Sequence, residues 1–268
     1  MDLQQLIGYA LAVFVGISLG LLGSGGSILT VPILVYVMAV SPVLATAYSL
    51  FIVGITALIG SIKNGFEKKI DFRKVLIFGI PSIFSVLITR LYLLPMVPLQ
   101  VFQIGSFKIT KSVLIMIVFS VVMILASFTM LKSPKRISRF EENAPKNYNY
   151  PLIFIVGIGI GILAGFVGSG GGFLIIPTLI FLAKTPIKKA VATSLCIIAI
   201  QSCIGFLGDL QNNILIDWST LLRFTLSAIV GVFIGIALTK KIAAKKLKKG
   251  FGWFVLIMGI YILLKELL

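Results

Sequence analysis

Residues 161–172 read Gly161-Ile162-Leu163-Ala164-Gly165-Phe166-Val167-Gly168-Ser169-Gly170-Gly171-Gly172, and Pro177 follows five positions later. Residues 16–27 read GISLGLLGSGGS and are followed at the same spacing by Pro32. The two stretches lie 145 positions apart, and the same register matches Ala45, Ser49 and Gly60 to Ala190, Ser194 and Gly205. Residues or segments matched in this way are called repeat mates. We call residues 23–27 the first glycine run and residues 168–172 the second glycine run. A repeated segment in which glycines interrupt an apolar run is typical of the binding site of a two-repeat transporter.

The composition places the chain in a membrane. Hydrophobic residues make up 59% of it and charged residues 12%, against roughly 25% charged in soluble domains. We therefore expect an all-α, multi-pass protein of the cytoplasmic (inner) membrane. Its ten apolar segments lie near 6–22, 27–40, 43–62, 74–94, 112–131, 151–168, 172–183, 187–207, 218–239 and 251–267.

The charged residues exclude several classes of function. Lys and Arg number 24 against 8 acids, which gives a net charge of +16. Most basic residues fall between apolar segments, where they set membrane topology, so the excess does not indicate nucleic-acid binding. The chain has no histidine, no P-loop and no nucleophile–base constellation. We therefore expect no metal, no cofactor and no enzymatic activity.

Two of the apolar segments, 27–40 and 172–183, are too short to cross a membrane. A helix of about 12–14 residues covers about 18–21 Å, whereas the hydrocarbon core is ~30 Å thick. Irregular backbone at membrane depth is tolerated only where protein or a water-filled cavity satisfies its polar groups. The sequence therefore predicts broken helices, with each glycine run buried inside the protein.

The loop charges predict the orientation of the two halves. The loop 63–74 is basic, whereas its repeat mate 208–217 carries only Asp209 and Asp217. Equivalent loops of opposite charge lie most simply on opposite sides of the membrane. We therefore predict two inverted-topology repeats with both termini outside. Membrane repeat 1 spans 1–131, a basic cytoplasmic linker spans 132–150, and membrane repeat 2 spans 151–268.

The glycine runs are suited to an anion. Helix N-termini carry unpaired N–H groups and a partial positive charge, and glycines let backbone N–H groups converge on a ligand. Helices that begin after Gly26 and Gly171 would aim their N-termini at the runs. Hydroxyl and amide groups on the runs and on the following helices would add donors. The predicted substrate-binding residues are Gly23, Ser24, Gly25, Gly26, Ser27, Ser49, Gly168, Ser169, Gly170, Gly171, Gly172, Thr193, Ser194 and Gln201.

Helix packing is the alternative explanation for part of this pattern. Small residues four apart let membrane helices approach closely, and hydroxyl side chains often bond back to their own helix. The glycines to which this applies are Gly16, Gly20, Gly161, Gly165, Gly231 and Gly235.

Arg90 is an intramembrane charge, which costs about 2.5–3.5 kcal/mol at a helix centre.

In the second glycine run with Pro177, and in the run Ala192-Thr193-Ser194-Leu195, the chain resembles the TauE/SafE family of sulfite and organosulfonate exporters. The resemblance covers nearly the whole chain and implies a polytopic inner-membrane permease for small sulfur oxyanions, sulfonates or carboxylates. The chain departs from the family pattern at Ser27, which stands in place of a third consecutive glycine. The segment 91–111 is also long for the family.

The expected function is secondary transport of a small anion, such as sulfite or an organosulfonate, by alternating access around the paired glycine runs. The expected partners are this anion, with or without coupled protons, and membrane lipid. An anion channel that uses the runs as a filter and a carrier for a non-sulfur carboxylate are the alternatives.

Overall fold

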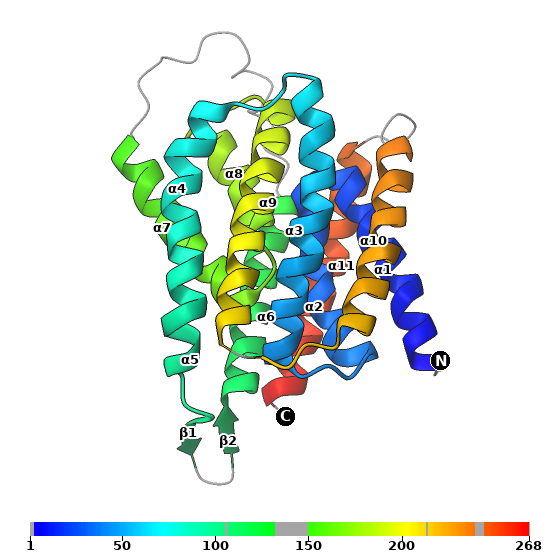
Figure 1. The fold of residues 1–268 in the computed structure, drawn as a ribbon, viewed down its shortest axis with the longest axis vertical. Coiled ribbons are helices and arrows are strands. Elements are labelled where there is room, and N and C mark those ends of the chain that lie inside the picture. Colours follow the sequence, from blue (N-terminus) through cyan, green and yellow to red (C-terminus); the bar gives the residue numbers. More distant parts are fainter. Residues whose placement is uncertain (1–2, 105–106, 132–149, 213, 239–243, 268) are drawn as a thin grey trace.

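The computed structural model describes residues 3–104, 107–131, 150–212, 214–238 and 244–267. Helices that follow the long axis of the molecule make up nearly all of this part (Figure 1). Within it, seven helices are long and apolar enough to cross a membrane, and three shorter apolar helices are Gly26–Val37, Pro151–Val167 and Gly172–Phe181. The prediction of an all-α, multi-pass membrane protein is confirmed.

The first half of the chain begins with a helix that is broken after Leu22. Its elements are α1 (Leu3–Leu22), the 3-10 helix η1 (Gly23–Leu29), α2 (Thr30–Pro32), the π-helix η2 (Ile33–Val37), α3 (Pro42–Phe66), α4 (Phe72–Ile88), the π-helix η3 (Thr89–Leu93), α5 (Leu94–Met96), the strands β1 (Gln100–Ile104) and β2 (Phe107–Thr110), and α6 (Lys111–Leu131). The strands form an antiparallel hairpin, which the all-α prediction did not include. This hairpin accounts for the long segment 91–111 and projects from one end of the bundle (Figure 1).

The second half has the same order of helices without the hairpin. It consists of α7 (Tyr150–Val167), α8 (Gly172–Phe181), α9 (Ile187–Gln211), α10 (Trp218–Leu238) and α11 (Ala244–Leu267). The predicted linker 132–150 lies outside the described residues except for Tyr150, and so does the start of the basic cluster 240–249.

The helices pair in a two-fold pattern. The most extensive contacts join α1 to α10, α4 to α7, α3 to α9 and α6 to α11. Exchanging each helix for its repeat mate turns the α1–α10 pair into the α7–α4 pair and leaves α3–α9 and α6–α11 unchanged. This is the pattern that two repeats related by a pseudo-two-fold axis produce.

The central helices α3 and α9 run antiparallel. Arg90 bonds both to Thr46, near the start of α3, and to Asp209, near the end of α9. At the other end, the backbone N–H of Asp71, which follows α3, donates to Oγ1 of Thr193 near the start of α9 (3.0 Å). Because α3 and α9 are repeat mates, their opposite directions confirm the inverted topology of the two repeats.

One local device starts the helices α4 and α10. Asp71 caps α4, where its carboxylate accepts from the N–H of Lys74, and Asp217 caps α10, where Oδ1 accepts from the N–H of Ser219 at 3.0 Å. The N–H of each aspartate donates to a hydroxyl on a central helix of the other repeat. Asp71 donates to Thr193 in α9, and Asp217 donates to Tyr48 in α3. Tyr48 and Thr193 are repeat mates, so both halves of the fold fasten the same helix start in the same way.

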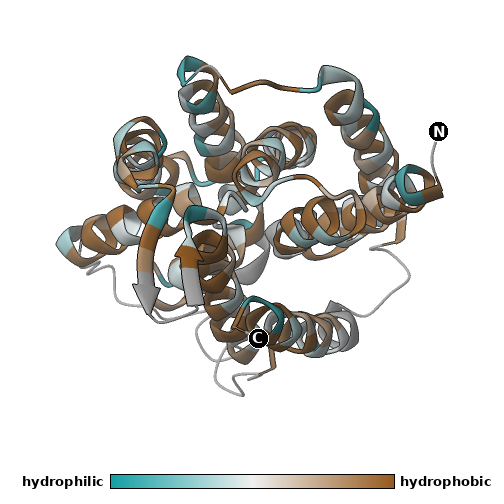
Figure 2. Cartoon of the chain, turned by 90° about the horizontal axis from the view of Figure 1, so that it is seen from below, coloured by the Kyte–Doolittle hydropathy of each residue, from teal (hydrophilic) through white to brown (hydrophobic). Residues whose placement is uncertain are grey.

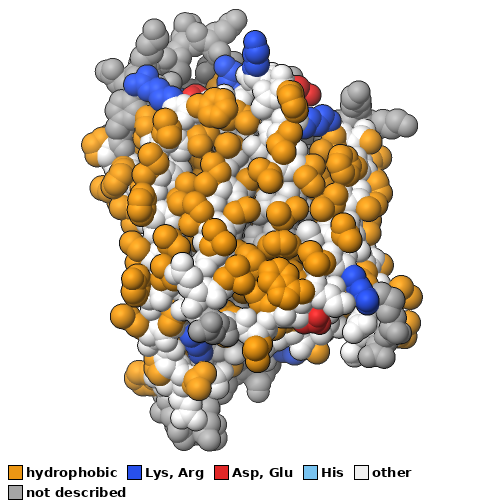
Figure 3. All heavy atoms as spheres, in the orientation of Figure 1, with side chains coloured by type: hydrophobic (Ala, Val, Ile, Leu, Met, Phe, Trp, Pro, Cys, Tyr) orange, Lys and Arg blue, Asp and Glu red, His pale blue; other side chains and the backbone are white. Residues whose placement is uncertain are grey.

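The two ends of the molecule differ in charge. Lys68 and Lys69 lie at the end that we call the basic end, and there Lys74 Nζ donates to Oγ1 of Thr185 at 2.9 Å. Figure 3 shows Lys and Arg side chains along this end, at the top of the view. The loop 212–217 lies at the other end, which we call the opposite end, as its hydrogen bond to Tyr48 at the start of α3 shows. The predicted separation of the loops 63–74 and 208–217 is confirmed, and the positive-inside rule predicts that the basic end faces the cytoplasm.

The described chain begins and ends toward the opposite end. Gly8 in α1 lies against Met38 of the turn before α3. The hydroxyl of Tyr36, in the same region, donates to Glu266 Oε1 at 2.8 Å near the end of α11.

Apolar side chains cover the outside of the bundle. Hydrophobic positions are spread over the helices when the bundle is viewed from the opposite end (Figure 2), and apolar side chains fill its middle zone in the side view (Figure 3). Phe84, Phe128, Leu226 and Phe233 are each more than half exposed in the bundle, which suits contact with lipid. The protein is therefore a multi-pass protein of the cell membrane.

Candidate functional site

The second glycine run forms a tight turn between α7 and α8. Gly168, Gly170 and Gly171 have φ of 72°, 67° and 62°, which lie in the left-handed region. Glycine adopts this conformation without the steric cost that a Cβ imposes. Gly171 is the N-cap residue of α8, which begins at Gly172. The predicted helix start after Gly171 is confirmed.

The other helices approach this turn closely. A Cβ at Gly168 would lie 2.5 Å from the carbonyl oxygen of Thr46 in α3, and a Cβ at Gly170 would lie 2.7 Å from Oγ of Ser202 in α9. The glycines therefore do two things here, since they permit the turn and they allow α3 and α9 to pack on it.

Gln201 of α9 links the turn to a further helix, α4. Its Nε2 donates to the carbonyl oxygen of Gly170, and its Oε1 accepts from Oγ of Ser82 in α4 at 2.7 Å. The structure thus brings Gln201 to the second glycine run, as predicted. Ser169 in the run and Ser202 beside it are both buried, and neither hydroxyl has a hydrogen-bond partner among the residues that the structure describes. An unsatisfied buried hydroxyl is costly and calls for an explanation such as an absent ligand.

The first glycine run differs from the second. Gly23 is its only residue with a positive φ, of 72°, and the backbone then continues as the 3-10 helix η1 into α2 and η2. The first run is therefore helical where the sequence predicted irregular backbone, while the predicted apolar helix after Gly26 is present as Gly26–Val37. Within this stretch the N–H of Thr30 donates to the carbonyl oxygen of Ser27. The backbone of Ser24 and Gly25 lies in η1, and the Ser24 side chain lies outside the described part.

The predicted hydroxyl residues on the following helices separate into two kinds. Thr193 accepts from the N–H of Asp71, and Ser194 donates to the carbonyl oxygen of Val191 at 2.9 Å on its own helix. Ser49, the repeat mate of Ser194, is buried, and within the described part of the chain its hydroxyl has no partner. Ser27 is buried in η1. Ser49 therefore keeps a free donor, whereas Thr193 and Ser194 are already engaged.

A cavity of about 330 Å³ reaches the first glycine run from the basic end. It lies among α1, α3, α9 and α10, and Lys63, Asn64, Glu67 and Lys69 are its polar residues toward the basic end. Its deeper wall includes Gly23 and Thr56, and Thr56 is the repeat mate of Gln201. The remaining lining residues are Leu19, Gly20, Leu21, Gly60, Val191, Leu195, Val232 and Ile236. We call this cavity the vestibule; of the predicted site residues whose burial the structure describes, Gly23 alone lines it.

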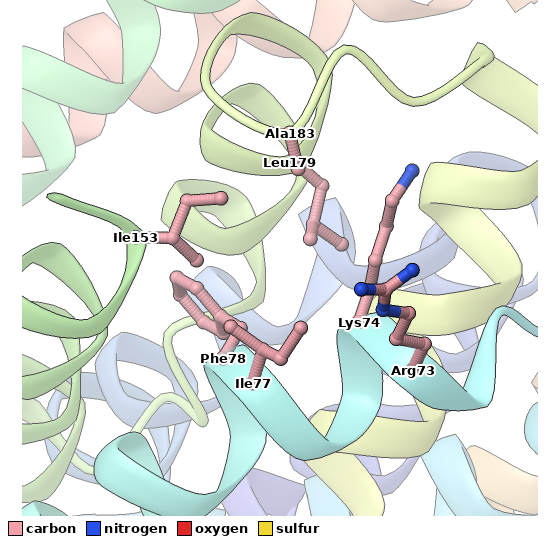
Figure 4. A pocket seen from close by; sticks show the side chains of 7 residues that line it. All are labelled: Arg73, Lys74, Ile77, Phe78, Ile153, Leu179 and Ala183. Carbon is pink, nitrogen blue, oxygen red and sulfur yellow. The ribbon is translucent and has the colours of Figure 1, made fainter. Parts of the chain in front are cut away.

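A second, much smaller pocket lies beside α4, α7 and α8. Its volume is about 20 Å³, which has room for about one water molecule. Figure 4 shows Phe78, Ile77, Ile153 and Leu179 around it, with Arg73 and Lys74 at one edge. Apolar walls and this size make it a packing defect and not a site for an oxyanion.

Arg90 and Asp209 form a buried ion pair that the sequence reasoning missed. Asp209 was predicted to lie in a loop, but it belongs to α9 and is 1% exposed, and Arg90 is 0% exposed. Nη1 of Arg90 lies 3.1 Å from Asp209 Oδ2 and 3.1 Å from Thr46 Oγ1. The repeat register gave no warning, because the predicted segment 43–62 also ends before Asn64, the residue that matches Asp209.

The glycines with a spacing of four lie at helix interfaces, as the packing explanation predicts. Gly16 and Gly20 of α1 face Gly231 and Gly235 of α10, and Gly161 of α7 faces Ser82 and Ser85 of α4. These glycines bring the paired helices together outside the two runs.

Taken together, the features describe a class of protein. The chain has membrane-spanning helices in inverted repeats, glycine-bearing breaks in a helix of each half, and a polar vestibule that leads to one break. This combination defines a polytopic membrane transporter. The sequence profile described as sulfite exporter TauE/SafE matches residues 8–262, and the chain belongs to this family.

Curated relatives carry names of the same kind. A "probable membrane transporter protein" of Xylella fastidiosa (strain Temecula1) is 29% identical over 93% of this chain and 91% of its own length. The "probable membrane transporter protein YunE" of Bacillus subtilis (strain 168) is 29% identical over 91% of this chain and 89% of its own. A probable membrane transporter protein of Methanocaldococcus jannaschii is 27% identical over 98% of both chains. No solved structure matches the chain.

Proposed function

We propose that this protein is a secondary transporter that moves a small anion, a sulfur oxyanion or organosulfonate such as sulfite, by alternating access around the two glycine runs. One observation carries the proposal. The vestibule leads from the basic end to the first glycine run, whereas the region around the second run is packed by α3 and α4. Two related sites, one accessible and one closed, are what a carrier with inverted repeats has in each of its end states.

The chemistry of the site supports an anion. Lys63 and Lys69 lie at the vestibule with Glu67, and an excess of positive charge raises the local concentration of anions. Deeper in the protein, the N-terminus of α8 follows the second run and carries a partial positive charge. The partnerless hydroxyls of Ser169 and Ser202 lie at the same turn and can donate to an oxyanion. Sulfite, sulfonates and carboxylates all accept hydrogen bonds of this kind.

Packing around the second run favours a carrier over a channel. A channel filter needs a path that is open to both sides at once. Thr46 of α3, Arg90 of η3 and Asp209 of α9, which lie between the second run and the opposite end, are each at most 1% exposed. A substrate that leaves the vestibule in the other direction must therefore wait for these helices to separate, which favours slow and saturable transport.

The test is anion uptake into proteoliposomes that contain the purified chain. Labelled sulfite, thiosulfate, a sulfonate and a carboxylate are supplied separately, with and without an imposed pH gradient. We expect saturable flux of a sulfur anion, and a dependence on the pH gradient would identify protons as the coupled ion. Flux of the carboxylate alone would reject the sulfur assignment. No flux from folded protein would reject transport and leave the glycine runs as packing devices.

The partnerless hydroxyls provide a variant that separates binding from stability. Ser169→Ala removes a buried hydroxyl that bonds to nothing in the described structure, so we expect unchanged or slightly higher thermal stability. If this hydroxyl donates to the anion, the half-saturation concentration for sulfite should rise. The matched control is Ser194→Ala, since the Ser194 hydroxyl bonds to its own helix. Equal half-saturation in Ser169→Ala and the unsubstituted protein would remove Ser169 from the site.

A further inference from the structure

Arg90 lies where three helices of both repeats meet. It belongs to η3, at the end of α4, and its Nη1 reaches Asp209 in α9 and Thr46 in α3. Its own carbonyl oxygen accepts from Nδ2 of Asn212 at 3.0 Å. The guanidinium thus holds α3, α4 and α9 together near the opposite end of the molecule.

The repeat places the Arg90 cluster where the second half of the chain would have its counterpart of the vestibule. Asn64 and Val191 line the vestibule, and their mates 145 positions away are Asp209 and Thr46. The two pairs therefore lie at equivalent places in the two repeats. The place of Asn64 and Val191 is a cavity, whereas the place of Asp209 and Thr46 is filled by the bonded Arg90 side chain.

The position of Arg90 follows from the helix contacts. Gly20 faces Val232 and Gly235 in α10, and its mate Gly165 faces Val86 and Thr89 in α4. Val86 therefore matches Val232 and Thr89 matches Gly235, so α4 and α10 match at a spacing of 146 positions. At this spacing the repeat mate of the vestibule residue Ile236 is Arg90. An apolar side chain at the wall of the open cavity is thus replaced by a charged side chain in the closed one.

The closed region is filled by residues of α3 and α4. A Cβ at Gly208 would lie 3.2 Å from Cβ of Arg90, and a Cβ at Gly205 would lie 2.7 Å from Val86 and 3.1 Å from Leu50. Thr46, Arg90 and Asp209 are buried here, whereas their vestibule mates Val191, Ile236 and Asn64 are partly exposed, so the equivalent passage is shut.

One edge of the guanidinium is available to a ligand. Asp209 and Thr46 bond only to Nη1, while Nε and Nη2 are buried and have no partner in the described structure. Nε and Nη2 together form the edge that holds a planar or tetrahedral oxyanion through two parallel hydrogen bonds. A buried guanidinium with this edge unsatisfied is costly unless a ligand uses it at some stage.

We propose that Arg90 is a substrate-binding residue on the path from the opposite end, that its Nε–Nη2 edge holds the oxyanion, and that its pair with Asp209 keeps this path closed while that edge is empty. The proposal rests on the proposed function, because it assigns a ligand to the anion that the protein moves. It makes the two half-paths unequal: the vestibule depends on glycine and lysine, and the opposite path depends on a guanidinium.

Labelling tests the closure without a substrate. Leu50→Cys on the closed path is compared with Leu195→Cys, its repeat mate in the vestibule, in a chain that also carries Cys196→Ala and Cys203→Ala. A membrane-impermeant maleimide is applied to either side of oriented proteoliposomes. We expect Leu195→Cys to react from the basic end and Leu50→Cys to stay unreactive. Adding Asp209→Asn should raise the reaction of Leu50→Cys from the opposite end several-fold, and an unchanged rate would overturn the closing role of the pair.

Transport kinetics test the binding role. Arg90→Lys keeps the charge and loses the two-donor edge, so the half-saturation concentration for labelled sulfite should rise about tenfold, which corresponds to about 1.4 kcal/mol. The control is Arg73→Lys, an exposed residue at the other end of α4, which should leave that concentration unchanged. An Arg90→Lys protein with unchanged half-saturation would overturn the binding role. Absence of sulfite flux in the unsubstituted protein would reject the proposed function, while the labelling result would still decide whether the pair closes the path.

Discussion

Gly168→Ala is expected to abolish anion flux and to lower the thermal stability of the protein. Gly168 has φ of 72°, and a Cβ there would lie 2.5 Å from the carbonyl oxygen of Thr46. A left-handed conformation costs a non-glycine residue roughly 1–2 kcal/mol, and the contact with the backbone of α3 adds to this because neither partner can move alone. The turn that presents the second glycine run would shift, and α3 would be pushed away from it.

The matched control is Gly159→Ala, nine positions earlier in α7. A Cβ at Gly159 has nothing within 4 Å, and alanine is favoured over glycine in a helix by up to about 1 kcal/mol. This variant should therefore keep full flux and melt at the same or a slightly higher temperature. Flux in proteoliposomes and thermal unfolding in detergent measure both variants. Full flux in Gly168→Ala would show that the shape of the second run does not matter for transport.

Asp209→Leu is expected to destabilise the protein strongly, whereas the double variant Arg90→Leu/Asp209→Leu should recover most of the loss. The single change leaves the guanidinium, which is 0% exposed, with Thr46 as its side-chain partner. Removing one partner of a buried ion pair costs about 3–5 kcal/mol, while replacing both partners with apolar residues is often neutral or stabilising.

Unfolding of the purified protein in detergent distinguishes these cases. We expect the melting temperature to fall clearly for Asp209→Leu and to return toward that of the unsubstituted protein in the double variant. Anion flux should stay low in the double variant, because it lacks the proposed ligand Arg90. A double variant as unstable as the single one would mean that the loss comes from the shape of Asp209 and not from an unpaired charge.

Much of the architecture could be predicted because it is encoded locally. Apolar length and loop charge fix which segments cross the membrane and in which direction, and they gave the ten apolar segments and the opposite placement of the loops 63–74 and 208–217. The second glycine run was also predictable, since several glycines in succession are needed where three residues take left-handed conformations.

The errors came where the outcome depends on neighbours. The first glycine run was expected to be irregular buried backbone, but with one left-handed glycine and with Ser27 in the last position it continues as a 3-10 helix. Asp209 was assigned to a loop because charge usually marks the end of a membrane helix. Its partner Arg90 lies 119 positions away in the chain, and no local pattern announces such a pair.

The sequence by itself thus determined that the protein is a membrane-spanning pair of inverted repeats with a glycine-bearing break in each half. These properties follow from residue type and periodicity alone. The tertiary structure alone decided that the two breaks are unequal, since the vestibule reaches the first run while α3 and α4 close the second. The reason is physical: whether a passage between helices is open depends on the side chains that meet across it, and here Ile236 borders an open passage where its mate Arg90 is paired with Asp209.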